Sequence, residues 1–264
     1  MNSVDHKRLV QEYYSRRAHD YDRQKTRTWD SKQGFGDEIA EAMVDALQDC
    51  KGKPVLEVCV GTARTTLLLL AKVKPLLVGL DFSKEMLERA KKKTSSCESK
   101  PDFVLGDAEH LPFVDKAFAA VVCTSSMHYF TDLNRNLAEF LRILHNEGVF
   151  LYGDLTLHES DSGRFLDRME STVSYAHGKY CTPSEVKGML EDLGFTVSTP
   201  TVVPYRKSFK SLMEDKGRYF SVEPEALEKC VNNASEEERR LYAINGNELT
   251  LFYTVMKAVK KGGL

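Results

Sequence analysis

The sequence predicts an α/β fold, with a doubly wound and mostly parallel sheet covered by helices on both faces. Between residues 54 and 154, short β-branched runs alternate with helix-length amphipathic segments. This alternation is typical of parallel strands joined by crossover helices. The chain has 264 residues, 42% of them apolar, which is enough to close one substantial core. We therefore predict a single domain spanning 1–264.

The first five strands are predicted from apolar, β-branched runs that end at turn-forming or polar residues. Ser83 is placed to cap the helix after the second run, and apolar side chains spaced three and four apart form one face of a helix at 133–144. Such helices must cover both faces of a parallel sheet. The predicted strands are 54–60, 76–80, 103–105, 121–123 and 149–152.

Residues after 154 are predicted to close the sheet with two antiparallel strands, 195–203 and 249–259. A capping box that begins at Thr182, with Pro183 at the first helical position, marks the helix before them. Three further segments are interpreted as helical additions to the sheet. They are an N-terminal cover at 1–50 and substrate-side insertions at 155–181 and 204–248, which are expected to form a lid.

The composition argues against two classes of partner. The formal net charge is −2, so a clamp that binds nucleic acid through bulk charge is not expected. No apolar run reaches the ~20 residues that a membrane span needs, and no export signal is recognisable. The six cysteines lack metal-ligand spacing, which predicts free thiols, no metal site and a cytoplasmic location.

The turn after the first strand is the predicted start of a binding site, because ligands of open parallel sheets bind beyond the carboxyl ends of the strands. Its sequence is Glu57-Val58-Cys59-Val60-Gly61-Thr62-Ala63. Arg64 stands where a dinucleotide fingerprint needs its third glycine, which argues against a nicotinamide oxidoreductase. The loop instead resembles the E-x-G-x-G-x-G loop of class I S-adenosylmethionine-dependent methyltransferases, in the subgroup that includes the ubiquinone and menaquinone C-methyltransferases.

A second match follows the second strand. The residues Asp81-Phe82-Ser83 and then Met86-Leu87 are similar to the D-x-S-x-x-M-L element of the same family. In that family the acidic residue accepts both ribose hydroxyls, so the resemblance assigns this contact to Asp81. It also implies that Phe82 and Met86 sandwich the adenine.

A third match, Gly106-Asp107-Ala108-Glu109 before Leu111-Pro112-Phe113, is similar to the family's G-D-A-x-x-L-P-F element, in which the aspartate takes the adenine amino group. The family also implies a seven-stranded sheet in the order 3-2-1-4-5-7-6. S-adenosylmethionine is then the expected cofactor. Its predicted contacts are Glu57, Gly61, Asp81, Phe82, Met86, Asp107, Ala108, Cys123 and Tyr21.

Methyl transfer to a small molecule is the function that the resemblance implies. A sulfonium already carries an activated methyl, so the protein must mainly align the acceptor and exclude water. His128 follows the fourth strand and is the candidate general base, with a packed rim histidine as the alternative. Tyr14, Tyr129 and Tyr205 are predicted to contact the acceptor. The alternatives are core anchoring for Tyr14 and solvated surface for Tyr205.

Two further alternatives stay open. Glu57 either contacts the cofactor or orients the loop through backbone amides. Cys59 and Ala63 stand where the family prefers glycine, and their Cβ atoms penalise positive φ and hold a ligand farther from the backbone. A catalytically silent relative that serves as a binding or partner subunit is therefore the alternative to an enzyme. Acceptor identity is expected to depend on the two insertions.

Overall fold

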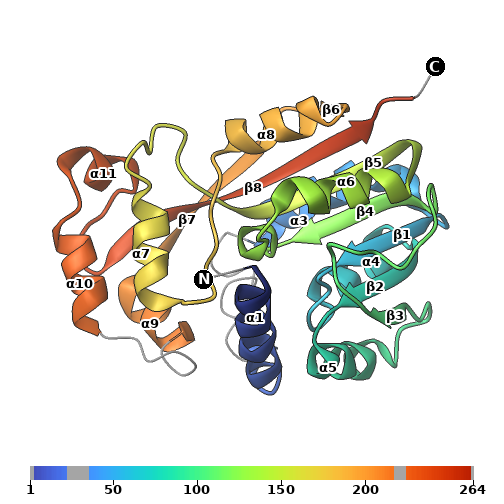
Figure 1. Ribbon diagram of the computed structural model, residues 1–264, viewed down its shortest axis with the longest axis horizontal. Helices are drawn as coiled ribbons and strands as arrows, with labels where there is room; N and C mark the ends of the chain where they lie inside the picture. Colours follow the sequence, from blue (N-terminus) through green and yellow to red (C-terminus); the bar gives the residue numbers. More distant parts are fainter. Residues whose placement is uncertain (1–2, 23–35, 217–223, 263–264) are drawn as a thin grey trace.

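The computed structural model describes residues 3–22, 36–216 and 224–262. At its centre lies one mixed sheet of eight strands, with the order β3-β2-β1-β4-β5-β8-β6 and with β7 paired to β8 (Figure 1). The predicted succession 3-2-1-4-5-7-6 is confirmed, because β8 occupies the position expected of the last strand. The α/β class and the mostly parallel sheet are confirmed with it.

Five neighbouring strands run parallel and end at one edge of the sheet. Val58 at the end of β1 lies opposite Leu80 of β2 and Cys123 of β4. The segments that follow these strands therefore meet at this edge, as the sequence predicts for the binding site. The five strands are β1 (Pro54–Val58), β2 (Leu76–Asp81), β3 (Asp102–Leu105), β4 (Phe118–Thr124) and β5 (Leu144–Thr156).

Alternate residues of the central strands enter two different cores, because successive side chains of a strand point to opposite faces. Val121 packs in one cluster with Leu137 and Phe140, whereas Val122 packs in another with Ile39. Both faces are thus covered, as a doubly wound fold requires. Helices α6 (Leu133–Ile143) and α8 (Pro183–Asp192) supply the first cluster, and α3 (Gly36–Ala46) and α4 (Arg64–Lys72) supply the second.

Two predicted helix starts are confirmed by their hydrogen bonds. The Ser83 hydroxyl accepts from the Met86 amide at 3.3 Å and caps α5 (Lys84–Thr94). Both halves of the capping box between Thr182 and Glu185 are formed at the start of α8. These bonds satisfy amides that have no partner inside the helix.

The prediction of one continuous strand at 195–203 is wrong. The segment is divided into β6 (Phe195–Val197) and β7 (Thr201–Ser208), which both pair antiparallel with β8 (Glu248–Lys260). Pro200 lies in the interruption, where it has no amide to give to the ladder. The sheet consequently has eight strands instead of seven, and the first residues of the predicted insertion 204–248 belong to β7.

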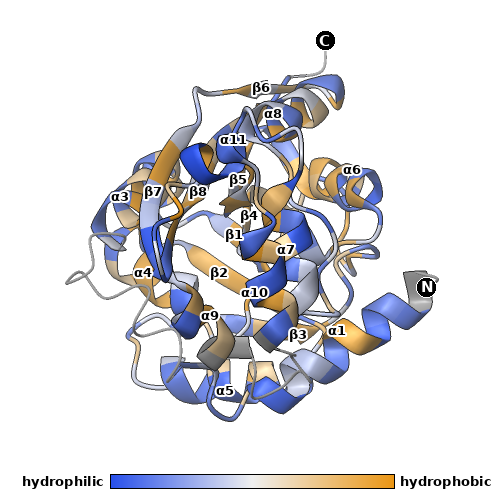
Figure 2. Cartoon of the chain, turned by 90° about the vertical axis from the view of Figure 1, so that its left-hand side faces the viewer, coloured by the Kyte–Doolittle hydropathy of each residue, from blue (hydrophilic) through white to orange (hydrophobic). Residues whose placement is uncertain are grey.

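The remaining parts of the two insertions form a small core of their own at the β7 end of the sheet (Figure 1). Phe165, Leu227 and Tyr242 are buried there, and the Tyr242 hydroxyl donates to Asp161 at 2.6 Å. Figure 2 looks from this end, with hydrophobic β2 at the centre and largely hydrophilic α5 at the periphery. The helices of this region are α7 (Phe165–Val173), α9 (Phe209–Lys216), α10 (Pro224–Asn232) and α11 (Glu236–Leu241).

Within the described residues, the predicted N-terminal cover contains two α-helices with different positions. α1 (Ser3–Arg17) lies beside α5, whereas α3 packs on a sheet face and leads through the short helix η2 (Gln48–Cys50) to β1 (Figure 1). The part of the cover at 23–35 lies outside the described residues. Among the helices that the structure describes, none is long and apolar enough to cross a membrane.

Candidate active site

A pocket lies at the carboxyl ends of β1, β2, β3 and β4, where the sequence predicts the binding site. Its lining residues are far apart along the chain. They come from α1, the β1 turn and the loops after β2, β3 and β4. Nine of the predicted site residues line this pocket. They are Tyr14, Tyr21, Glu57, Gly61, Asp81, Phe82, Asp107, Ala108 and Tyr129.

The turn between β1 and α4 contains three left-handed residues, with φ of 56° at Cys59, 54° at Gly61 and 64° at Ala63. The predicted conflict between a Cβ and positive φ is therefore real at two of them, at a cost on the order of 1 kcal/mol each. At Gly61 itself, an added Cβ would meet only a carbonyl oxygen at 4.0 Å. The strain lies in the backbone angles, and the space above the turn stays open.

Asp81 ties this turn to the start of α5. Its carboxylate accepts from the Gly61 amide at 2.8 Å and from the Ser83 amide at 2.9 Å, and the residue is 5% exposed. Burial raises the pKa of Asp81 to about 6, although the backbone hydrogen bonds oppose the rise. A carboxylate oriented in this way keeps lone pairs for ligand hydroxyls, and its contact with ribose stays a prediction.

Glu57 is bound to a helix side chain. The Thr66 hydroxyl of α4 donates to its Oε2 at 2.6 Å, and the residue is 2% exposed. Burial raises the pKa of Glu57 to about 8, so the carboxyl is largely protonated at neutral pH. The bond found here orients the loop through the following helix, while a contact with the cofactor stays open because Glu57 also lines the pocket.

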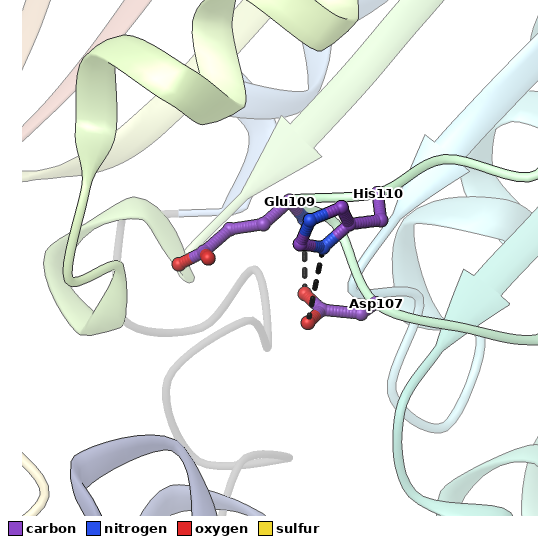
Figure 3. Close-up of side chains that lie close together, drawn as sticks. All are labelled: Asp107, Glu109 and His110. Carbon is purple, nitrogen blue, oxygen red and sulfur yellow. Dashed lines mark hydrogen bonds and ion pairs between the residues drawn. The ribbon is translucent and has the colours of Figure 1, made fainter. Parts of the chain in front are cut away.

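Asp107 and Glu109 meet a cation from α1 at the far end of the pocket. The Lys7 ammonium lies 2.8 Å from Asp107 Oδ2 and 2.5 Å from Glu109 Oε2. Burial opposes ionisation, but Lys7 and the Glu109 amide hold the pKa of Asp107 below its usual value. Asp107, Glu109 and His110 also have ligand atoms within 4.8 Å of one another (Figure 3). A metal ion there would have to displace the Lys7 ammonium from two carboxylates.

His128 forms a buried pair with Asp154, a residue that the sequence analysis did not predict. His128 lies on the short helix η3 (Met127–Tyr129) after β4, and Asp154 lies on the neighbouring strand β5. Nδ1 of the imidazole is 2.9 Å from Oδ1 and 3.0 Å from Oδ2 of Asp154. His128 is 8% exposed and Asp154 is 1% exposed. A carboxylate at this distance favours the tautomer with the proton on Nδ1, in which Nε2 is the acceptor.

Tyrosines form the wall between this pair and the pocket. The ring of Tyr129 lies 4.0 Å from His128 and 5.4 Å from Tyr14, and Tyr14 lies 6.1 Å from Tyr21 between centroids. Burial raises the pKa of Tyr129 to about 12, so its hydroxyl stays neutral. The wall presents apolar ring surface together with hydroxyl groups.

Four predicted residues do not reach the pocket lining. Met86 is 1% exposed on the inner side of α5, and Cys123 is fully buried in β4. His128 lies behind Tyr129. Tyr205 lies on β7 opposite Leu251, beyond β8 from the strands that end at the pocket. Spacing along the chain could not show that these side chains turn into the core or lie on another strand.

Four residues at the site were not predicted as contacts. Arg64 enters the sequence analysis only as an argument against a dinucleotide site, yet it lines the pocket at the start of α4, and burial lowers its pKa. Lys7 reaches the site through a long-range ion pair that gives no local signal. Asp154 comes two residues after the predicted strand 149–152, near the carboxyl end of β5 and beside β4, and that position could have indicated it. Asn136 lines the pocket from within a helix face that is otherwise apolar.

The sheet order and a pocket at this edge define the class I methyltransferase architecture. Solved structures support the same fold. The YcgJ protein from Bacillus subtilis has a TM-score of 0.74 and 23% identity over 85% of this chain and 98% of its own. A putative methyltransferase from Bacillus halodurans has a TM-score of 0.76 and 23% identity over 84% and 98%.

Comparison of sequences shows which proteins the chain resembles. Residues 55–148 match the model described as a methyltransferase domain. A demethylmenaquinone methyltransferase from Thermotoga maritima is 27% identical over 188 residues, 62% of this chain and 80% of that protein. One from Staphylococcus epidermidis is 41% identical over 101 residues, but the chain spans only 42% of its length. Residues 55–148 thus match a methyltransferase domain, and S-adenosylmethionine is the methyl donor that this family implies.

Proposed function

We propose that this chain transfers the methyl group of S-adenosylmethionine to a small apolar acceptor and that His128 removes the acceptor's proton. The observation that carries the proposal is the buried pair of His128 and Asp154 beside the tyrosine wall of the pocket. An imidazole held by a carboxylate on one nitrogen is suited to accept a proton on the other.

The pocket fits the donor in two respects. The β1 turn leaves open space above Gly61. The side-chain amide of Asn136 lines the pocket, and its buried atoms have no hydrogen-bond partner among the described residues. Asp81 would hold the ribose, and the guanidinium of Arg64 would attract the carboxylate of the methionyl part. The bound donor supplies a methyl on a positively charged sulfur.

The protein's own contribution is alignment and proton removal. Because Tyr129 lies between His128 and the pocket, the acceptor's proton would have to pass this side chain to reach Nε2 of His128. Asp154 would then stabilise the imidazolium that forms. Tyr14 and Tyr129 would hold the acceptor in line and exclude water from the path of transfer. α1 would cover the cofactor, and the insertions 155–181 and 204–248 would shape the acceptor side.

The acceptor class is supported by the wall and by the relatives. One relative is a demethylmenaquinone methyltransferase. Another is a phthiotriol/phenolphthiotriol dimycocerosates methyltransferase from Mycobacterium tuberculosis, which is 37% identical over 108 residues. The second match covers 40% of this chain and 39% of the relative. We infer an apolar acceptor with an ionisable hydroxyl. The cytoplasmic location stays a prediction.

A transfer assay with methyl-labelled S-adenosylmethionine tests the proposal. Demethylmenaquinol and a panel of phenols and secondary alcohols are offered as acceptors to the wild type and to His128→Asn. Labelled product from the wild type alone supports the base. Tight donor binding without product from any acceptor would favour the alternative of a catalytically silent subunit. The left-handed backbone at Cys59 and Ala63 is the structural feature that motivates this alternative.

A further inference from the structure

Asn136 is a buried polar side chain for which the described structure offers no partner. It lies on α6, is 0% exposed, and lines the cofactor pocket. Neither Oδ1 nor Nδ2 has a hydrogen-bond partner among the described residues. A buried amide without partners costs free energy that a ligand can recover by bonding to it.

Two acidic side chains that line the same pocket already have hydrogen-bond partners. Glu109 pairs with Lys7 and accepts from the Thr131 hydroxyl at 3.0 Å. Asp107 accepts from Lys7 and from the Glu109 amide. Asn136 therefore stands out, because it offers both a donor and an acceptor on one planar group.

We propose that the Asn136 amide binds the Hoogsteen edge of the adenine of S-adenosylmethionine, with Oδ1 accepting from N6 and Nδ2 donating to N7. Asn matches this edge of adenine with two hydrogen bonds. The amino group has two hydrogens, so Asp107 can take the one beside N1 while Asn136 takes the one beside N7. The inference rests on the proposed function, since it needs this ligand in this pocket.

Calorimetry with two ligands tests it. The first is S-adenosylhomocysteine, and the second is S-tubercidinylhomocysteine, in which C–H replaces N7. The variants are Asn136→Ala and the near-isosteric Asn136→Leu, and the matched control is Asn134→Ala at an exposed position of the same helix. The wild type and the control should bind the first ligand about 5- to 30-fold more tightly than the second.

Both Asn136 variants should bind S-adenosylhomocysteine more weakly and should lose most of this preference. A merely structural role would weaken both ligands equally, so an unchanged ratio in a folded Asn136→Ala overturns the inference and leaves the proposed function standing. If one variant does not fold, the other gives the ratio. Failure of the wild type to bind S-adenosylhomocysteine at all overturns the proposed function together with the inference.

Discussion

Asp154 fixes His128 through the nitrogen that carries the proton in the proposed base. An amide at position 154 can present its N–H to Nδ1 and so favours the tautomer protonated on Nε2, which cannot accept a proton. We expect Asp154→Asn to lower kcat by about 10²- to 10⁴-fold, with the affinity for S-adenosylhomocysteine unchanged. Steady-state kinetics and calorimetry measure the two effects.

The matched control for this change is Asp102→Asn, at an exposed position of β3. It alters the net charge equally and should leave kcat as in the wild type. Equal turnover of the two variants would contradict the base role of His128.

Glu57 predicts a pH dependence of stability with a definite sign. Its pKa is about 8 in the folded chain, above the ordinary value of 4.5, so the folded state binds the proton more tightly. The stabilisation is present below pH 4.5 and is lost as the pH rises through about 8. Glu57→Gln keeps an acceptor for Thr66 and removes this loss. We expect urea unfolding between pH 5 and 9 to show that the free energy of unfolding of the variant rises relative to that of the wild type as the pH increases. A constant difference between the two proteins over this range would refute the shifted pKa.

A substitution at Cys59 distinguishes an active enzyme from a catalytically silent subunit. The Cys59 φ of 56° suits glycine, so Cys59→Gly relaxes the turn at the cost of more freedom in the unfolded chain. In a competent enzyme the affinity for S-adenosylmethionine should change by less than about 1 kcal/mol. In a silent relative whose loop is closed against the ligand, affinity should rise sharply. One titration of each protein distinguishes these outcomes, and Cys97→Gly outside the pocket serves as control.

At the scale of elements, the parts predicted from sequence are those with a strong local signal. β1 to β5 follow from buried β-branched runs, and the capping box between Thr182 and Glu185 forms as its residues predict. The division of β6 from β7 was missed because pairing along β8 tolerates a gap that periodicity does not show. Strand order was available only through the family resemblance, since periodicity alone leaves the order of crossovers open.

α1 is the element whose removal should separate activity from folding. It bonds to loops and to a helix start, through Lys7 to Asp107 and through Gln11 to the Phe82 carbonyl at 2.7 Å, and it pairs with no strand. Deleting residues 1–17 should leave the sheet folded while turnover falls by about tenfold or more. Circular dichroism and kinetics measure both effects. S-adenosylhomocysteine should also slow hydrogen exchange of α1 amides in the full chain. Full activity of the truncated chain would show that α1 is not the cover.

At the scale of the whole molecule, site residues that belong to one sequence motif could be predicted. Contacts that the fold forms between residues far apart in the sequence could not. Asp81 ends β2 and Gly61 follows β1, and the motifs at these two strand ends predicted both residues at the binding site, where the Gly61 amide donates to Asp81. The pairing of His128 with Asp154 depends on the register of β4 against β5, and the pairing of Lys7 with Asp107 spans 100 residues. Such contacts exist only in the folded molecule, so single-sequence patterns do not report them.

Binding to the folded chain should stabilise the whole molecule, because the pocket draws on α1, four strand ends and the start of α4 and is lost on unfolding. A ligand at one hundred times its Kd contributes about 2.7 kcal/mol. For a chain of this size that corresponds to a rise in Tm of roughly 5 to 10 °C. Thermal scans with S-adenosylmethionine and S-adenosylhomocysteine measure it. NAD is the matched control, since Arg64 occupies the third glycine position of the dinucleotide fingerprint. An equal rise in Tm with NAD, or no rise with either adenosyl ligand, would show that this pocket is not specific for S-adenosylmethionine.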